Sequence, residues 1–314
     1  LVTATGPGVT GVTARIDGGA ATASVEVYLP PEVSGYVPGT AYFGRRDYVE
    51  YVPGTLPVVI SAPHGGDLEP DEIPPRAAGT HITDLNTIPV ARAVREAFLD
   101  QVGAAPHVVI LHLDRAGLDA NREIAEAAEG NRLAERAWEE YHGFLDVASD
   151  EVEDAWEHGL YLDVHGHGHT IPRIELGYLV PAALLNLSDA ELEAAGPGPS
   201  SSLAELHART GGDFVPLLRG PASLGAALDA EGYPAVPSPS DPGPASDPYF
   251  SGGYSTARHG SRDGGTVDGV QLELNRAGIR DSPANWTAFA AALARVVRGF
   301  LAMHYGHALG ATGR

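Results

Sequence analysis

Five apolar segments of strand length recur along the chain, and segments with helical spacing separate them. They cover residues 56–61, 106–113, 160–164, 174–180 and 269–275. Most are apolar at successive positions rather than alternating ones, which is typical of strands buried between two layers of helices. The alternation predicts an α/β fold, a three-layer αβα sandwich around a mostly parallel or mixed central sheet.

Three other stretches define the expected organisation. Residues 1–50 are rich in Gly, Thr, Val and Tyr with alternating polarity, which predicts a small N-terminal β extension. Residues 51–314 are expected to form one larger domain, in which the Pro-, Gly- and Ser-rich stretch around 232–262 is a loop insertion. A final helix is predicted to begin at Pro283, because Ser282 is a favoured N-cap and proline suits the first helical position.

The composition narrows the chemistry. All 20 basic residues are arginine, and the chain has neither lysine nor cysteine. Lysine-based phosphate sites, Schiff bases, thiol nucleophiles and thiolate metal sites are therefore excluded. With 41 acidic residues the net charge is −21, which argues against nucleic acid or an anionic membrane as a partner. No apolar run approaches the roughly 18–20 residues of a membrane helix.

Polar motifs follow several of these strands, where ligands bind in such folds. His64 and Asp67 follow the first strand within Pro-His-Gly-Gly-Asp, a spacing that can place an imidazole and a carboxylate on one metal ion. Glu69 is the alternative second ligand. An ordinary turn with a capping Asp67 is the simpler interpretation of the same residues.

A second motif, Asp163-Val-His-Gly-His-Gly-His169, follows the third strand. In an extended chain His165, His167 and His169 point to the same face about 6–7 Å apart, so one or two of them are expected to reach a single ion. Asp163 would fix an imidazole by a hydrogen bond. A loop with adventitious metal affinity is the alternative.

Glu273 lies inside the last apolar strand, where an ionised carboxylate is costly unless it is paired or bound. Such a group suits a general base that takes a proton from an activated water. The alternative is an edge-strand glutamate that faces solvent or pairs with Arg276.

Two further motifs are candidates for substrate binding. Asn121 and Arg122, in Asp119-Ala-Asn-Arg, could clamp a substrate carboxylate, since arginine binds carboxylates in a bidentate manner. Alternatively, Asp119 caps a helix and Arg122 pairs with a nearby glutamate. The glycine-framed loop 252–260 could offer Tyr254 and Arg258, or be only a surface loop.

Taken in order, these motifs resemble the N-formylglutamate amidohydrolase family, whose relatives include the zinc carboxypeptidases and acylglutamate deacylases. The resemblance runs from about residue 51 to residue 305. It is carried by Pro-His-Gly-Gly (63–66), Thr-Asp (83–84), Asp-Ala-Asn-Arg (119–122), Asp-Val-His (163–165) and Gln-Leu-Glu-Leu-Asn-Arg (271–276).

The resemblance implies a hydrolase that cleaves an amide bond with one zinc ion. His64, Asp67 and His165 would hold the metal, and Glu273 would be the general base. Asn121 and Arg122 would bind the substrate carboxylate. Asp84 is expected to be structural or to support the ligands, as are Asp163 and His167.

Other functions stay open at this stage. A zinc carboxypeptidase on the same scaffold is one alternative, and a metal-binding module without catalysis is another. The expected partner is a small or peptide-like substrate, anionic in character. A chain that begins with Leu1 is compatible with secretion after removal of an upstream signal, which leaves the compartment open, and the oligomeric state is open too.

Overall fold

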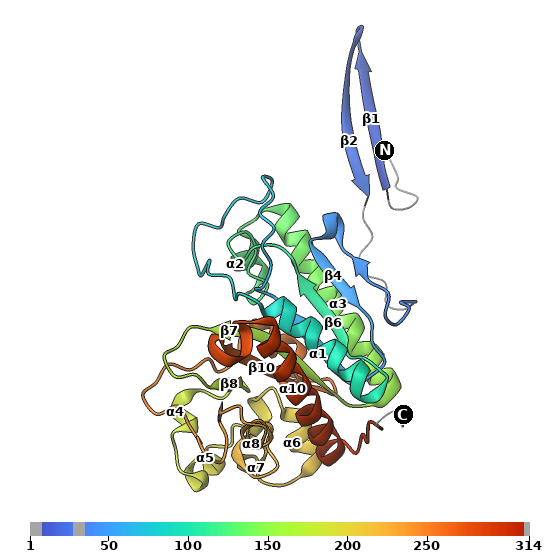
Figure 1. Ribbon diagram of the computed structural model, residues 1–314. Coiled ribbons are helices and arrows are strands. Elements are labelled where there is room, and N and C mark those ends of the chain that lie inside the picture. Colours follow the sequence, from blue (N-terminus) through green and yellow to red (C-terminus); the bar gives the residue numbers. More distant parts are fainter. Residues whose placement is uncertain (1–7, 28–34, 311–314) are drawn as a thin grey trace.

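An eight-stranded sheet forms the centre of the protein (Figure 1). The computed structural model describes residues 8–27 and 35–310. The strand order is β3-β4-β6-β5-β7-β10-β8-β9. The strands are β3 (Tyr42–Phe43), β4 (Val49–Val52), β5 (Val58–Ala62), β6 (His107–Leu111), β7 (Gly159–His167), β8 (Ile174–Gly177), β9 (Ala235–Val236) and β10 (Val267–Asn275).

The four central strands, β6, β5, β7 and β10, run parallel to one another. Their carboxyl ends therefore meet at one edge of the sheet, which is where the polar motifs of the sequence lie. Antiparallel neighbours flank this block, with β4 beside β6 and β8 beside β10. The predicted α/β fold with a mixed, mostly parallel sheet is confirmed.

Helices cover both faces of the sheet and give each face its own core. One face packs against α1 (Thr87–Val102) and α10 (Pro283–His304), and the other against α3 (Arg132–Trp156). Strand β5 shows why both faces must be apolar, because Val58 belongs to the first core and Val59 to the second.

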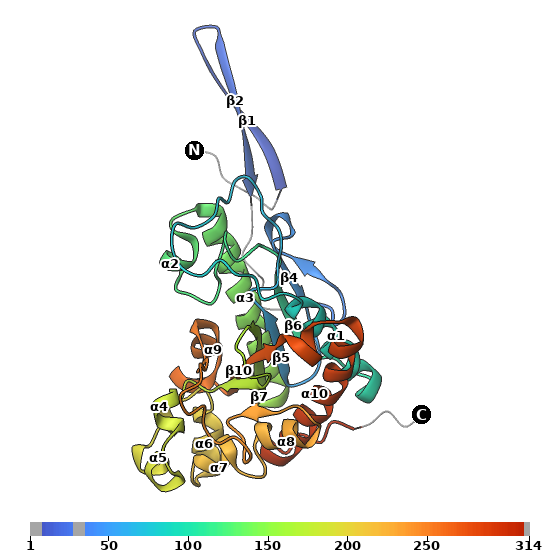
Figure 2. The same cartoon turned by 60° about the vertical axis from the view of Figure 1, so that its left-hand side comes forward.

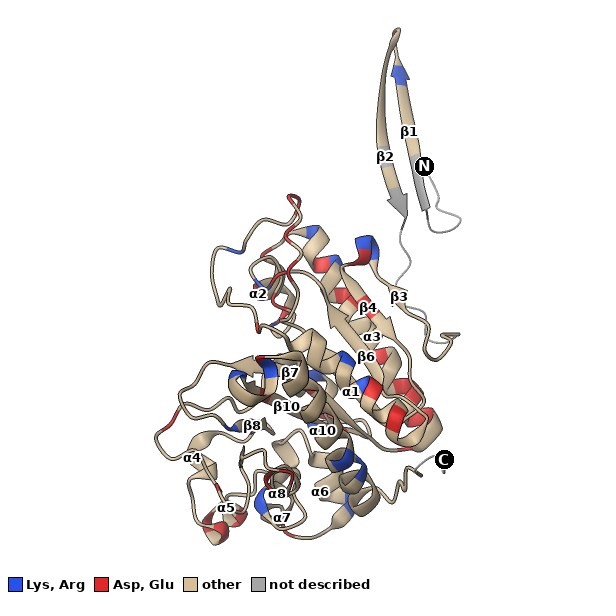
Figure 3. Cartoon of the chain, in the orientation of Figure 1, with Lys and Arg blue, Asp and Glu red and all other residues tan. Residues whose placement is uncertain are grey.

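Short helices complete the domain. They are α2 (Ile124–Ala128), α4 (Ala182–Leu185), α5 (Asp189–Ala195), α6 (Ala204–Thr210), α7 (Val215–Arg219), α8 (Leu224–Ala230) and α9 (Tyr254–His259). The insertion predicted at 232–262 thus contributes an edge strand, β9, and helix α9 to the domain, in addition to loop. In Figure 3 the acidic residues are spread over several elements, among them α3 and α5.

The N-terminal β extension is an antiparallel hairpin of β1 (Gly8–Ile16) and β2 (Gly19–Val27). It stands apart from the rest of the chain in both views (Figures 1 and 2). The main sheet begins before residue 51, because β3 pairs with β4 and β4 pairs with β6.

The last helix, α10, begins as predicted, with the Ser282 hydroxyl accepting a hydrogen bond from the Asn285 amide. It has 22 residues and is long and apolar enough to span a membrane. Its apolar side, with Phe289, Leu293 and Val297, is buried in the core shared with α1. The burial accounts for this apolar character as that of a core helix.

Candidate metal centre

Three buried side chains meet at the carboxyl edge of the parallel strands. His64 lies in the loop after β5, Asp84 lies just before α1, and His165 lies near the end of β7. The two Nδ1 atoms are 3.1 Å apart. Oδ2 of Asp84 lies 3.5 Å from Nδ1 of His64 and 3.3 Å from Nδ1 of His165. Residues distant in sequence thus present three ligand atoms to one point.

Asp119, from the loop after β6, holds the far side of the His64 ring. Its Oδ1 lies 2.6 Å from Nε2 of His64, and both residues are almost completely buried. Nε of Arg115 donates to the other carboxylate oxygen at 3.1 Å. Asp119 therefore orients the ring and leaves Nδ1 pointing at Asp84.

Asp163 lies beside the His165 ring. Its Oδ2 lies 3.0 Å from Nε2 of His165. The hydroxyl of Ser61 donates to Oδ1 of Asp163 at 2.6 Å, and that of Thr256 to Oδ2 at 3.3 Å. That Asp163 fixes an imidazole by a hydrogen bond stays a prediction, because the 3.0 Å contact lacks hydrogen-bond geometry.

The protonation of the two rings follows from these carboxylates. A neutral imidazole carries one N–H; Nε2 of His64 is hydrogen-bonded to Asp119, while Nε2 of His165 lies 3.0 Å from Asp163 without hydrogen-bond geometry. When both rings carry their proton on Nε2, both Nδ1 atoms present lone pairs to each other and to the Asp84 oxygen. Three acceptors at such distances repel one another unless they share a cation.

The dimensions suit a small metal ion. Tetrahedral zinc with ligands at about 2.0–2.1 Å requires ligand atoms about 3.3–3.4 Å apart. The three observed separations, 3.1, 3.3 and 3.5 Å, bracket that value. The buried His64, Asp84 and His165 group could therefore hold a metal ion.

The charges agree with a cation in this position. Burial would raise the pKa of Asp84, but His165 and His64 outweigh burial and hold it well below its usual range. Burial opposes protonation of His165, yet the Asp163 carboxylate and Asp84 raise its pKa well above the ordinary value. Without a metal, a proton shared among these groups takes the place of the cation.

Glu273 lies next to the three ligands. It is the cross-strand neighbour of His165, so both side chains project from the same face of the sheet. Gln271 donates to its Oε1 at 3.0 Å. Burial raises the pKa of Glu273 to about 8, with further increases from Asp84 and Glu175 against an opposing effect of His165. A carboxyl group with these surroundings is suited to exchange protons near neutral pH.

This raised pKa predicts a pH-dependent stability of the metal-free protein. Between about pH 5 and pH 8 folded Glu273 keeps a proton that the unfolded chain has lost, so it destabilises the fold increasingly as the pH rises. We expect Glu273→Gln, made metal-free with a chelator, to be more stable than the unsubstituted protein at pH 8, by on the order of 2 kcal/mol. The difference should vanish near pH 4. Urea unfolding at both values measures it, and equal differences at the two pH values would contradict it.

Asp67 and Glu69, the predicted second ligand and its alternative, do not join the site. Both are exposed. Asp84 supplies the carboxylate instead, because a backbone hydrogen bond of 2.9 Å from its amide to the His64 carbonyl brings the loop before α1 beside the loop after β5. The assignment of the second ligand therefore moves from Asp67 to Asp84.

Asn121 and Arg122 follow Asp119 directly. Asn121 is nearly buried, and its Oδ1 accepts a hydrogen bond from the Ser255 amide at 2.8 Å. Arg122 is partly exposed and pairs with Glu126 at 3.2 Å, as the simpler interpretation predicted. The backbone places both residues near the metal group, with Arg122 more accessible than Asn121.

The contact between Asn121 and the loop before α9 leaves room for no side chain at Gly253. A Cβ atom there would lie 2.3 Å from Nδ2 of Asn121. We expect Gly253→Ala to lower the free energy of unfolding by about 1–3 kcal/mol. Gly212→Ala, where a Cβ meets nothing within 4 Å, is the matched control. Urea unfolding of both variants checks this, and equal stabilities would contradict it.

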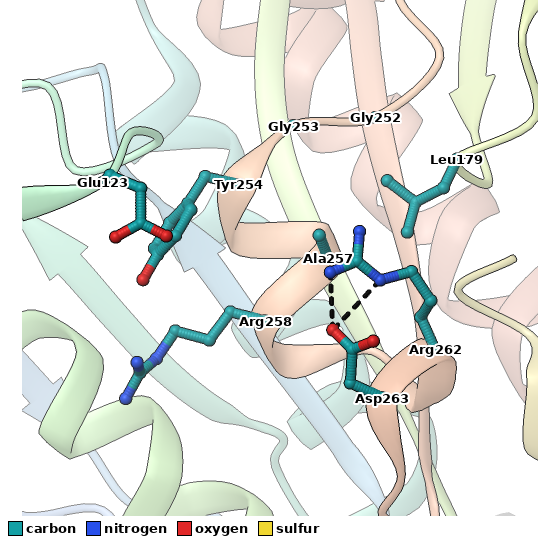
Figure 4. A pocket seen from close by; sticks show the side chains of 9 residues that line it. All are labelled: Glu123, Leu179, Gly252, Gly253, Tyr254, Ala257, Arg258, Arg262 and Asp263. Carbon is teal, nitrogen blue, oxygen red and sulfur yellow. Dashed lines mark hydrogen bonds and ion pairs between the residues drawn. The ribbon is translucent and has the colours of Figure 1, made fainter. Parts of the chain in front are cut away.

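Tyr254 and Arg258 line a pocket of about 550 Å³ beside α9 (Figure 4). Tyr254 packs against Trp138 and His142. Arg258 lies over the Trp138 ring and pairs with Asp146 at 2.9 Å. Both side chains are thus engaged with α3, and Gly253, which lines the pocket, lies against the Asn121 side chain.

His167 does not belong to the group formed by His64, Asp84 and His165. Its Nε2 lies 2.8 Å from the Arg173 carbonyl, and its Nδ1 accepts from the His169 amide at 3.1 Å. Both ring nitrogens are therefore used within the loop. His167, His169 and Glu175 form a second group with ligand-type atoms close together, but hydrogen bonds already occupy both nitrogens of His167.

Sequence reasoning missed the roles of Asp119 and Glu175. Asp119 was named within the Asp-Ala-Asn-Arg motif, with a helix cap as the alternative, but its contact with a metal-ligand candidate was not predicted. Glu175 lies in the apolar strand β8, and a buried carboxylate there was the available signal.

Comparisons with known proteins give similar folds only. No known protein family matches the sequence, and no curated protein does. Solved structures with similar folds include an N-formylglutamate amidohydrolase from Ralstonia eutropha JMP134, with TM-score 0.49 and 16% identity over 80% of this chain and 98% of that one. A gene product of Agrobacterium tumefaciens has TM-score 0.47 and 14% identity, over 82% and 94%. A candidate metallopeptidase from Shewanella amazonensis SB2B has TM-score 0.37 and 16% identity, over 82% of each chain. At such values function has to be argued from the residues of this chain.

Proposed function

We propose that this protein is a metal-dependent hydrolase that cleaves an amide bond in a carboxylate-bearing substrate, with zinc as the metal. The observation that carries the proposal is the convergence of three buried atoms that can bind a metal, Nδ1 of His64, Oδ2 of Asp84 and Nδ1 of His165, within 3.1–3.5 Å of one another. The ordered motifs that resemble the N-formylglutamate amidohydrolase family support the same class of reaction.

The donor set favours zinc, since two imidazoles and one carboxylate are typical of catalytic zinc sites that leave one position open. When bound, the ion would lower the pKa of a water molecule and polarise the scissile carbonyl. The carboxylates of Asp119 and Asp163 lie against Nε2 of His64 and His165, and this would leave both Nδ1 atoms free to bind the ion.

The chain's own residues would move the proton. Glu273, beside His165, would accept a proton from the attacking water and return it to the nitrogen of the leaving amine. Its burial excludes bulk water from this exchange. Asn121 and Arg122, in the loop after β6, are the candidates to bind the substrate carboxylate.

Zinc-loaded protein incubated with a panel of N-acyl amino acids tests the proposal, with the released amine measured by mass spectrometry. We expect release that a chelator abolishes and added zinc restores. No release from any acylated amino acid, peptide or ester, despite a bound metal, would favour a non-catalytic metal-binding module.

A zinc carboxypeptidase is the second candidate, since the same ligands and base serve peptide hydrolysis. The products distinguish the two activities. A peptidase of this kind releases a C-terminal amino acid from an unacylated peptide, whereas the amidohydrolase releases a small acid and an amino acid.

A further inference from the structure

His169 and Glu175 form an ordered pair. Nδ1 of His169 lies 2.7 Å from Oε1 of Glu175, whose side chain is 1% exposed. The second oxygen of Glu175 accepts from the Phe250 amide at 2.8 Å. The His169 ring stacks on Phe250, with centroids 4.8 Å apart and planes at 16°. The imidazole is therefore held on two sides, and no partner is found for its Nε2 among the described residues.

The pair adjoins the proposed general base. Glu175 is the cross-strand neighbour of Glu273 on β10, and Glu273 is in turn the neighbour of His165 on β7. A row of three buried ionisable side chains thus crosses the sheet on one face, from the metal ligand to the partner of His169. His169 lies at the solvent end of this row, with 22% of its side chain exposed.

Apolar side chains are exposed in the same loops. The described residues include ten exposed large apolar side chains, and half of them lie in the loops after β5 and β7 or in the loop before α9. These five are Leu68, Ile82, Leu85, Ile171 and Phe250. Exposed apolar surface at the edge of a site is typical of contact with an apolar ligand group.

We propose that His169 and Phe250 form the wall of a substrate subsite beside Glu273, and that this subsite takes an extended, uncharged acyl group with a flat apolar body. An anionic acyl group is disfavoured because the buried Glu175 carboxyl group lies directly behind the His169 ring. The inference rests on the proposed function and specifies its substrate class.

The probes are the N-formyl, N-succinyl and N-benzoyl derivatives of L-glutamate, L-alanine and L-phenylalanine, with kcat and KM measured for each. We expect kcat/KM for the preferred N-benzoyl compound to exceed that of its formyl and succinyl counterparts at least about tenfold. Phe250→Ala and His169→Ala should each lower kcat/KM for the benzoyl compound about 3–10-fold, mainly through KM, and leave the formyl compound unchanged.

Two matched controls separate a subsite from a structural role. Phe43→Ala removes an aromatic ring of similar exposure, 48% against 45% for Phe250. His112→Ala removes a histidine that is likewise 22% exposed and bound to a buried carboxylate, Glu50. Both controls should leave the acyl preference intact, and zinc content should be unchanged in all four variants.

Formyl or succinyl compounds cleaved as fast as benzoyl ones would overturn the inference, as would equal losses for all acyl groups in His169→Ala. If zinc-loaded protein cleaves none of the nine compounds, the proposed function fails instead. Binding of the benzoyl compounds would then be measured by calorimetry. Binding that Phe250→Ala weakens would still support the subsite. No binding to the unsubstituted protein, or equal binding to both proteins, would overturn it.

Discussion

Replacing Asp84 by alanine is expected to abolish tight metal binding, whereas replacing Asp67 by alanine should leave it intact. Asp84 offers an oxygen 3.3–3.5 Å from both ring nitrogens, while Asp67 is exposed and outside the group. Loss of a direct ligand should weaken binding by more than the roughly 10–100-fold typical of residues that only orient a ligand. Zinc titration against a competing chelator measures both variants.

The comparison with Asp67→Ala makes this test specific, because both variants remove one carboxylate from a loop near the carboxyl edge of β5 or the start of α1. Circular dichroism of the metal-free proteins should show that both variants fold. Loss of zinc in Asp67→Ala with retention in Asp84→Ala would reverse the assignment.

Glu273→Gln should lower kcat by about 10²–10⁴-fold with zinc content unchanged. The glutamine keeps the size of the side chain and removes the group that exchanges the proton, while the three proposed ligands stay in place. Steady-state kinetics on the best substrate of the panel, with metal analysis of the same preparation, gives both quantities.

Near-normal turnover in this variant would exclude Glu273 as the general base. Gln271→Glu is not a suitable control because it adds a charge to the site. His112→Ala is preferable, because His112 and its partner Glu50 lie on the opposite face of the sheet. His112→Ala should retain full turnover, because Glu50, the partner of His112, is bound to Arg92 of α1 and takes no part in the site.

The strands could be predicted from the sequence because most are apolar at successive positions and turn residues follow them. The predicted strand at 269–275 lies within β10 (Val267–Asn275), and the helix expected from Ser282-Pro283 begins as predicted. The charged, amphipathic pattern of residues 121–144 predicts one long helix, and this prediction is wrong. Glu129 and Gly130 adopt positive φ and break it into α2 and α3.

Site residues within or next to a strand could be located from the sequence, because the strand fixes their direction. His64, His165 and Glu273 are of this kind. Asp84 could not be placed, since it lies in a long loop without periodicity and reaches the site through one backbone contact with His64. The contact of Asp119 with Nε2 of His64 could not be predicted, because the two residues lie in different loops.

The most direct test of a metal centre at these residues is anomalous diffraction from crystals of the protein grown with zinc. We predict one strong peak between Nδ1 of His64, Nδ1 of His165 and Oδ2 of Asp84, about 2.0–2.1 Å from each. A peak held by Asp67, a peak only at His169 and Glu175, or no peak between the three residues would contradict the account.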